Sequence, residues 1–465
     1  MNSTQRFKFA AGAAMALLIV ACTPTTTTTT APAVPKAPVV AEEVRQPVTL
    51  LVSIDGFKPD YLRRGITPTL NKLAKEGAYA AMRPSFPSKT FPNHYTIVTG
   101  KRPNTHGIVD NNMRDIARPA PNENFSLGNS KQALDPFWWS SAEPIWVTAE
   151  RRGIRSATMF WPGSEVAIHG GRAQDWQRFD QNISNTQRVN AVIDWLRRPT
   201  NLRPKFLTVY FDTVDTAGHR HGPDSAEVNA AIADVDKQMG YLVASLAAMN
   251  QPVDFVITSD HGMAATSSQR LIDLDSLLPR DTYQIITTGP FAAINPLPGK
   301  ETIVDTALIT PPVPHANMEC WHKKEIPARY QYGSHPRIPE IFCLAKTGWK
   351  IVVGTPEYDA NGGDHGYDNF DPEMAAIFIA NGPHIAADKT LPTFDNVNVY
   401  PLLAYLIGIE PLPYDGVPHL PSDVRNVNAP PPPSPVSDPT ASAPQNQPTP
   451  GQATTPTLTT GSNPQ

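Results

Sequence analysis

Residues 48–56 read VTLLVSIDG, and this stretch decides the fold class. Its apolar, β-branched run ends in an aspartate, a pattern typical of a strand that is buried on both faces of a parallel sheet. Two later segments have the same form, KFLTVYFDTVD at residues 205–215 and DFVITSDHG at residues 254–262. AAIFIANG at residues 375–382 is a further strand candidate.

Amphipathic segments separate these strands. NAVIDWLRR at residues 190–198 and AEVNAAIADVDKQMGYLVASLAAM at residues 226–249 carry apolar residues at helical spacing. An alternation of strands and helices indicates a largely parallel sheet. We therefore predict the α/β class, with a mostly parallel central sheet flanked by helices.

The composition is that of a globular protein. The chain has 465 residues, of which 40% are hydrophobic and 8% aromatic, so it can bury a large core. A formal net charge of −4 gives no basic field for a nucleic-acid polymer, and we expect a small substrate instead. We predict one folded domain over residues 46–425.

Residues 1–22 have the form of a bacterial lipoprotein signal peptide. Arg6 and Lys8 precede an apolar run that is too short for a comfortable membrane span. The run ends at Cys22 in a sequence that resembles a lipobox, which is cleaved before a cysteine that then carries the lipid. An ordinary signal peptide with a buried cysteine is the alternative.

Low-complexity segments flank the predicted domain. Residues 23–45 form a Thr/Pro-rich tether, and residues 426–465 form a Pro-rich tail that we expect to be disordered. We predict an exported, lipid-anchored protein that is periplasmic or in the outer membrane. Thr23 stands where an aspartate is associated with inner-membrane retention, which favours the outer membrane.

Two cysteines remain in the predicted domain, Cys320 and Cys343. In an exported protein they could pair across the loop between them. Two buried free thiols are the alternative, and the sequence leaves both possibilities open.

Acidic residues follow each of the three predicted strands: Asp55, Asp215, and Asp260 with His261 after it. In open α/β sheets, ligands bind beyond the carboxyl ends of the strands. A single aspartate after a strand is commonly only a turn former. Three of them at corresponding positions indicate a site.

Histidines add to this set. Asp215 and His219 are four residues apart, which places two side chains on one side of a helical turn, and His365 lies in the glycine-containing segment GGDHGYDN at residues 362–369. Sets of carboxylate and imidazole ligands suit zinc well. Three aspartates and three histidines are enough for two metal ions, which could clamp the attacking and leaving oxygens of a displacement at phosphorus.

A candidate nucleophile is Thr90, in SFPSKTFPNHYTIVTG at residues 85–100. A threonine before Pro92 can simply cap a helix. It can also react, because a metal lowers the pKa of a bound hydroxyl and the start of a helix attracts phosphate. The two roles are compatible.

The ordered series of motifs resembles that of the nucleotide pyrophosphatase/phosphodiesterase family, a branch of the alkaline phosphatase superfamily. The resemblance extends from about residue 48 to about residue 415 and implies an alkaline phosphatase-like fold, two zinc ions and a threonine nucleophile. The motifs, in chain order, are SIDGF, FPSKTFPNHYTIVTG, HGIVDNNM, FWPGSE, DTAGHRHGP, SDHGM and GGDHGYDN.

The resemblance also implies roles for individual residues. Asn111, in preference to Asn112, would donate its amide to a phosphate oxygen. Lys89 receives no role. The implied ligands of one zinc ion are Asp215, His219 and His365, and those of the other are Asp55, Thr90, Asp260 and His261.

Aromatic residues would bind the base of a nucleotide. Phe91 and Tyr210 match positions that sandwich a nucleobase in family members, and Phe179 is matched with a third aromatic residue of that pocket. Without the resemblance, Phe91 and Tyr210 would equally suit a hydrophobic core. The full-length stretch at residues 114–146 is similar to the nucleotide-cleaving branch and not to the lysophospholipid-cleaving members, in which this loop is shortened.

We therefore predict zinc-dependent hydrolysis of nucleotide phosphodiester and pyrophosphate bonds. Substrates would be nucleoside triphosphates, dinucleotides or nucleotide esters, and a covalent threonine intermediate would release nucleoside 5′-monophosphates. The alternatives are a phosphomonoesterase or lysophospholipid phosphodiesterase of the same superfamily, and a non-catalytic nucleotide-binding lipoprotein. A sulfatase is less favoured, because no C/S-x-P-x-R context surrounds Thr90.

Overall fold

The structure is a computed structural model that describes residues 43–126, 128–354, 356 and 360–432. One compact unit begins at Arg45. The predictions for the signal peptide, for nearly all of the tether and for most of the Pro-rich tail fall on residues outside these ranges. Among the described residues, no helix has the length and apolar character needed to cross a membrane.

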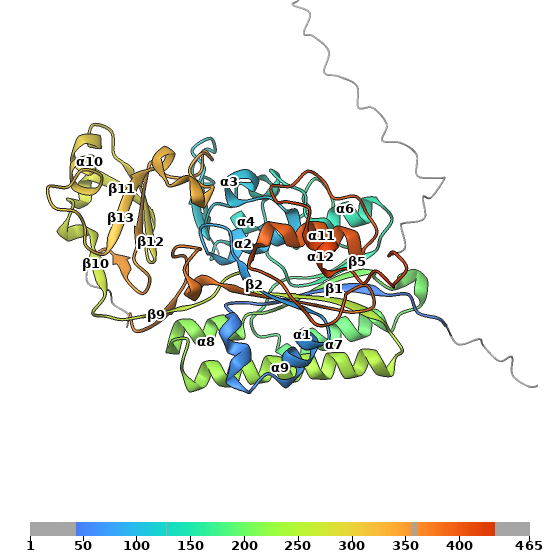
Figure 1. Cartoon of the computed structure of the whole chain (residues 1–465). Helices are drawn as coiled ribbons and strands as arrows, with labels where there is room; N and C mark the ends of the chain where they lie inside the picture. Colours follow the sequence, from blue (N-terminus) through green and yellow to red (C-terminus); the bar gives the residue numbers. More distant parts are fainter. Residues whose placement is uncertain (1–42, 127, 355, 357–359, 433–465) are drawn as a thin grey trace, which may run out of the picture. The chain divides into compact units, whose positions relative to one another are not determined.

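The compact unit is built on a mixed sheet that has nine strands among the described residues (Figure 1). They are β1 (Val48–Ile54), β2 (Ala78–Arg83), β5 (Ser156–Met159), β6 (Asp175–Gln177), β7 (Phe206–Phe211), β8 (Val253–Thr258), β17 (Ala376–Asn381), β18 (Lys389–Thr390) and β19 (Phe394–Asp395). The spatial order is β18-β2-β17-β8-β1-β7-β5-β6, and β19 also pairs with β2.

Most neighbouring strands of this sheet are parallel. The run β8-β1-β7-β5-β6 is parallel throughout, whereas β17 is antiparallel to both β8 and β2. The predicted α/β class with a mostly parallel sheet is thus confirmed. The strand predicted at residues 375–382 is the antiparallel one.

Helices cover both faces of the sheet (Figure 1). One face carries α1 (Pro68–Lys75), α7 (Asn185–Leu196) and α9 (Ala226–Ala248), and the other carries α2 (Thr90–Thr99), α6 (Ile145–Arg151) and α11 (Val399–Leu406). Strand β1 contributes to both cores because successive side chains alternate between faces. Val48, Leu50, Val52 and Ile54 pack on the first face, and Leu51 packs on the second.

A second, antiparallel sheet lies between β8 and β17 in the sequence. Its spatial order is β11 (Tyr283–Thr287), β12 (Phe291–Pro296), β14 (Ile341–Ala345) and β13 (Met318–His322), with α10 (Glu301–Leu308) following β12 in the chain. On one face, the ring of Phe342 lies 4.8 Å from that of Phe291 and 5.5 Å from that of Phe86. This contact joins the second sheet to the loop that precedes α2.

The remaining elements are short and connect or border the two sheets. The strands are β3 (Asn112–Arg114), β4 (Asn124–Ser126), β9 (Ala264–Thr266), β10 (Leu271–Asp273), β15 (Lys350–Val352) and β16 (Gly362–Asp364). The α-helices are α3 (Pro103–His106), α4 (Ser130–Ala133), α5 (Pro136–Trp139), α8 (Thr213–His221) and α12 (Leu420–Val424). The 3-10 turns are Pro59–Arg64, Thr200–Leu202, Leu274–Ser276, Arg280–Thr282, Lys323–Glu325, Ala328–Tyr330, Pro372–Met374 and Asn396–Asn398.

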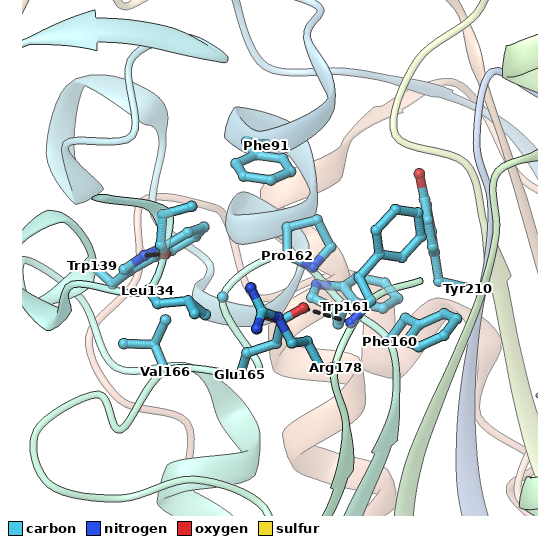
Figure 2. A pocket seen from close by; sticks show the side chains of 13 residues that line it. Phe91, Leu134, Trp139, Phe160, Trp161, Pro162, Glu165, Val166, Arg178 and Tyr210 are labelled. Atoms are coloured by element: carbon cyan, nitrogen blue, oxygen red, sulfur yellow. Dashed lines mark hydrogen bonds and ion pairs between the residues drawn. The ribbon is translucent and has the colours of Figure 1, made fainter. Parts of the chain in front are cut away.

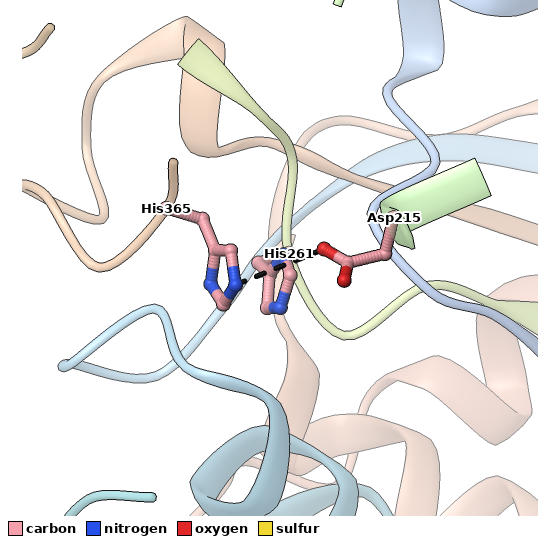
Figure 3. A group of neighbouring side chains, drawn as sticks. All are labelled: Asp215, His261 and His365. Carbon is pink, nitrogen blue, oxygen red and sulfur yellow. Dashed lines mark ion pairs between the residues drawn. The ribbon is translucent and has the colours of Figure 1, made fainter. Parts of the chain in front are cut away.

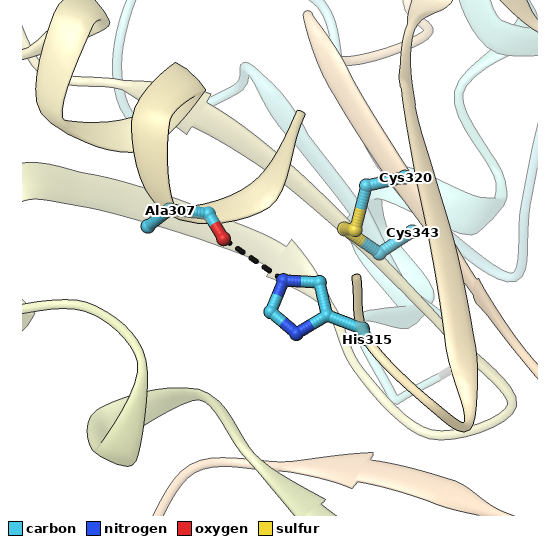
Figure 4. Close-up of a disulfide and its surroundings, with 4 residues drawn as sticks. All are labelled: Ala307, His315, Cys320 and Cys343. Atoms are coloured by element: carbon cyan, nitrogen blue, oxygen red, sulfur yellow. Dashed lines mark hydrogen bonds between the residues drawn. A yellow bond between two sulfur atoms is a disulfide. The ribbon is translucent and has the colours of Figure 1, made fainter. Parts of the chain in front are cut away.

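Cys320 and Cys343 form a disulfide between β13 and β14 (Figure 4). The two residues stand directly opposite each other in the strand register. Beside the bond, Nε2 of His315 donates to the carbonyl of Ala307 at 2.8 Å. The alternative of two free thiols is therefore wrong.

Replacing both cysteines with alanine should destabilise the protein. The bond closes a loop with a sequence separation of 23, and losing such a crosslink costs about 3 kcal/mol of unfolding free energy. Denaturant unfolding of wild type and of the Cys320→Ala/Cys343→Ala variant measures the difference. Equal stability, or two titratable thiols in denatured, unreduced wild type, would contradict a stabilising disulfide.

Candidate metal centre and nucleophile

Thr90 is the first residue of α2, and Lys89 precedes it at the cap position without a side-chain capping bond. The threonine hydroxyl does not cap the helix. Instead, Oγ1 lies 3.3 Å from Nε2 of His261. The start of α2 also carries a positive partial charge, which stabilises an anion placed there.

Asn93 holds the loop that enters α2. Its side-chain oxygen accepts a hydrogen bond from the backbone N–H of Ser85 at 2.7 Å, and its Nδ2 donates to the carbonyls of Pro87 at 3.0 Å and Lys89 at 2.8 Å. The side chain is completely buried. The backbone immediately before Thr90 is therefore fixed by one amide group.

The strand register brings the acidic residues together. Ser53 on β1 is opposite Tyr210 on β7 and Thr258 on β8, so Asp55 leaves the sheet beside the ends of both neighbours. Asp260 follows β8 by two residues. Asp215 departs from the prediction, because β7 ends at Phe211 and Asp215 lies in the first turn of α8.

One group of ligand atoms comprises Asp55, Asp260 and His261, all of them buried. Nε2 of His261 lies 2.8 Å from Oδ2 of Asp260 and 3.5 Å from Oδ1 of Asp55. The hydroxyl of Thr90 reaches the same imidazole nitrogen. The four residues assigned to one metal ion by the sequence thus lie in one cluster.

The second set centres on Asp215. Its Oδ1 lies 3.5 Å from Nε2 of His219 and 3.7 Å from Nε2 of His365, and these two nitrogens are 3.1 Å apart. Figure 3 shows Asp215 and His365 converging on His261. The rings of His261 and His365 stack with their centroids 3.4 Å apart, so the two ligand sets are contiguous.

The three imidazoles are oriented in the same way. Nδ1 of His219 faces the carbonyl of Gly363, Nδ1 of His261 that of Gly262, and Nδ1 of His365 that of Ser88, at 2.8–2.9 Å. A carbonyl only accepts, so each Nδ1 carries the proton and donates it. In the neutral form of each imidazole the lone pair is then on Nε2, the nitrogen that faces the cluster, as metal-binding histidines require.

The charge of the cluster calls for a cation. Burial, together with the carboxylates of Asp260 and Asp215, raises the pKa of Asp55 well above its ordinary value. Burial also raises the pKa of Asp215. Oδ1 of Asp55 and Oδ1 of Asp215 are buried without a hydrogen-bond partner. Divalent metal ions fit this donor set, because they neutralise carboxylates and accept imidazole nitrogen.

Asp364 is a neighbour of the cluster that the sequence analysis did not identify. One of its carboxylate oxygens lies within 4.8 Å of a ring nitrogen of His219 and of one of His365. Burial favours its neutral form, but Lys89, His219 and Lys350 lower the pKa of Asp364 below its ordinary value. Its position directly before His365 was the only sequence signal.

Asn111 is close to Thr90 through the backbone. Its side-chain oxygen accepts the N–H of Phe91 at 2.9 Å, so the amide is tied to the residue after Thr90. The Nδ2 donor is then the end of the amide available to a ligand. Asn112, by contrast, is exposed at the start of β3.

A cavity of about 180 Å³ is lined by Phe91, the residue after Thr90, and by Tyr210, which contacts Asp55 (Figure 2). Aromatic side chains dominate its lining, and the ion pair of Glu165 with Arg178 borders it. The aromatic lining residues are Phe91, Trp139, Phe160, Trp161, Phe179 and Tyr210. The structure therefore brings the three aromatic residues of the sequence prediction to one cavity.

Tyr210 and Phe179 have different environments in this cavity. Tyr210 is 8% exposed, and its hydroxyl donates to Oδ2 of Asp55 at 2.7 Å. Phe179 is 41% exposed, and its ring centroid is 5.9 Å from that of Tyr210. The bond between Tyr210 and Asp55 spans 155 residues, and no local pattern could have identified it.

A mixed α/β sheet with a hydroxyl, carboxylates and imidazoles gathered at its edge is the architecture of alkaline phosphatase-like enzymes. The chain belongs to the type I phosphodiesterase/nucleotide pyrophosphatase family, whose model matches residues 49–368. It is accordingly a hydrolase of phosphodiesters.

Relatives support this assignment over most of their length. The chain is 37% identical to the bis(5′-adenosyl)-triphosphatase of Xenopus laevis, covering 80% of each protein. The solved structure of human ectonucleotide pyrophosphatase/phosphodiesterase 5 matches with a TM-score of 0.77 and 36% identity, over 82% of this chain and 100% of that one. A murine phosphodiesterase 5 structure, described as inactive through a threonine-to-alanine substitution and in complex with AMP, matches with a TM-score of 0.76 and 34% identity, over 82% and 100% of the two chains.

Proposed function

We propose that the protein is a zinc enzyme that hydrolyses nucleotide phosphodiester and pyrophosphate bonds through a covalent intermediate on Thr90. The observation that carries the proposal is the position of the Thr90 hydroxyl, 3.3 Å from His261 in a cluster of ligand groups. The proposed zinc ligands are Asp215, His219 and His365 for one ion, and Asp55, Thr90, Asp260 and His261 for the other.

Each residue has a defined task in the displacement. Zinc ions supply Lewis acidity and lower the pKa of a bound hydroxyl. The oxygen of Thr90 forms a bond to the α-phosphorus while the bond from phosphorus to the leaving group breaks. Asn111 donates its Nδ2 protons to a phosphoryl oxygen, where negative charge develops. Water then cleaves the threonine ester, which releases the nucleoside 5′-monophosphate and restores the hydroxyl.

The cavity gives the preference for nucleotides a physical basis. An aromatic cavity beside a phosphoryl-transfer site suits a flat base, which stacks on rings whatever its identity. Two relatives agree, since one is named a bis(5′-adenosyl)-triphosphatase and a murine structure contains AMP. Within the cavity we assign base stacking to Phe91 and Phe179. Tyr210, which the resemblance placed with Phe91 in base stacking, is only 8% exposed, and we therefore assign its ring to the wall of the cavity and its hydroxyl to holding Asp55.

Thr90→Ala should reduce turnover by about three orders of magnitude or more, because the attacking oxygen is deleted. Its zinc content should remain near that of wild type, since six other ligands stay in place, and Thr90→Ser should retain measurable activity. Mass spectrometry after an acid quench should detect a nucleotidyl adduct on the Thr90 peptide of wild type. Near-normal hydrolysis by the zinc-loaded alanine variant would replace this mechanism with direct attack by water, and full activity of metal-free wild type would refute the zinc assignment.

The stacking assignment makes Phe179 and Tyr210 separable. Phe179→Ala should lower kcat/KM for the p-nitrophenyl ester of thymidine 5′-monophosphate by about 1–3 kcal/mol, or about 5- to 150-fold. It should leave bis-p-nitrophenyl phosphate almost unaffected. Tyr210→Phe keeps the ring and removes only the bond to Asp55, so it should lower both activities equally. Unchanged activity of Tyr210→Phe on both substrates would refute the role assigned to the Tyr210 hydroxyl.

We also propose that the enzyme is exported and anchored by lipid on Cys22, in the periplasm or the outer membrane. The lipobox-like sequence supports this proposal, and so does the disulfide, since such bonds persist in oxidising compartments. A radioactive fatty acid should label the protein in bacterial cells, and Cys22→Ala should abolish the label. Persistent labelling of that variant would exclude Cys22 as the anchor.

A further inference from the structure

Lys89 directly precedes the nucleophile, and its side chain is directed to Asp364. Nζ of Lys89 lies 3.5 Å from Oδ1 of Asp364, and Nζ of Lys350 lies 3.2 Å from Oδ2. The three side chains are only 10–14% exposed. The backbone N–H of His365 also donates to Oδ1, at 2.9 Å. One carboxylate is thus held from both sides by two ammonium groups.

Asp364 is close enough to the ligand cluster to join it. One of its oxygens and one ring nitrogen each of His219 and His365 lie within 4.8 Å of one another. Asp215 approaches the same two histidines at 3.5 and 3.7 Å. The chain therefore presents two carboxylates, those of Asp215 and Asp364, to one pair of imidazoles. A further interaction has to determine which carboxylate binds the metal ion.

The selection matters for the reaction. A catalytic zinc ion keeps a coordination position for substrate or water beside three protein ligands, whereas a fourth protein ligand closes the site. A carboxylate paired with two ammonium groups is a weaker metal ligand, because its charge is compensated and its lone pairs are engaged. Asp215 has no such lysine partner among the ion pairs of the described residues.

We propose that Lys89, with Lys350, is a positioning residue that holds Asp364 away from the metal and keeps a coordination position open. The inference rests on the zinc site proposed above and adds a role for Lys89 within it.

The backbone fixes Lys89 for this role. Nδ1 of His365 donates to the carbonyl of Ser88, and the Ser88 hydroxyl donates to the carbonyl of Tyr367, both at 2.8 Å. Gly366 has φ of +120°, and a Cβ there would lie 2.7 Å from Cε of Lys89. Residues 88–89 and 364–367 therefore pack as one unit, with the lysine stem against the glycine.

The Lys89→Met variant tests the inference, because it keeps the length of the stem and removes the charge. In competition with a chelator, the variant should bind zinc at least about tenfold more tightly than wild type. Its turnover should fall by about tenfold or more. Lys350→Met should act in the same direction and carries the test if Lys89→Met does not fold. X-ray absorption of the zinc-loaded variant should detect an added oxygen ligand.

The double variant Lys89→Met/Asp364→Asn separates positioning from direct catalysis. It has the formal charge of wild type at this cluster but lacks the competing carboxylate, so zinc affinity and turnover should return toward wild type. Lys237→Met, at an exposed position on α9, is the matched control and should change neither quantity.

Two outcomes would overturn the inference. Unchanged zinc affinity in Lys89→Met, or a loss of turnover that the double variant does not recover, would mean that Lys89 acts on the phosphate itself. If the proposed zinc function itself were wrong, the results would be different: wild type would contain no zinc, and the chelator would not reduce its activity.

Discussion

The parallel pairing of β1 with both β7 and β8 is the constraint on which the site depends. It places the ends of three buried strands at one edge, and the chain there carries Asp55, Asp215 and Asp260 within a few residues. Such a concentration of buried carboxylates is unfavourable unless cations or donors compensate it. The hydroxyl of Tyr210 and the start of α2 supply part of this compensation, and the carboxylates and imidazoles are grouped as ligands for a metal ion that would supply the rest. The geometry that would be a liability in a structural protein is therefore the basis of a metal centre.

Glycines explain how the imidazoles can be oriented by backbone carbonyls. The carbonyl of Gly363 accepts from Nδ1 of His219, and a Cβ on Gly363 would lie 2.7 Å from the carbonyl of Gly218 and 2.8 Å from the sulfur of Met263. Neither neighbour could be that close, so a side chain would displace the segment and tilt the histidine. The glycine-containing motifs around the ligands are thus needed for close packing of loops as much as for turns.

Sequence reasoning was sufficient where the signal was local. A continuous apolar, β-branched composition identified buried strands such as the one within residues 48–56. The long helix α9 matches the predicted residues 226–249 within one residue. The direction of β17 was not predictable, since a buried strand has the same composition in either direction. The contact of Tyr210 with Asp55 and the position of Asp364 beside Lys89 were not predictable either. Their partners, Asp55 and Lys89, are 155 and 275 residues away, and only the folded sheet brings them together.

The cavity and the metal centre share a wall, which links recognition to chemistry. The ring of Tyr210 lines the cavity while its hydroxyl holds Asp55, and the ring packs nearly perpendicular to that of His94, with centroids 5.2 Å apart. His94 lies one turn after Thr90, and its Nδ1 is 2.9 Å from the Thr90 carbonyl and 3.4 Å from Asp260. A group bound in the cavity therefore contacts side chains that also hold a carboxylate and the backbone of Thr90. Binding energy from a base can in this way restrict the reacting groups to one geometry, so a base that packs poorly should reduce turnover as well as affinity.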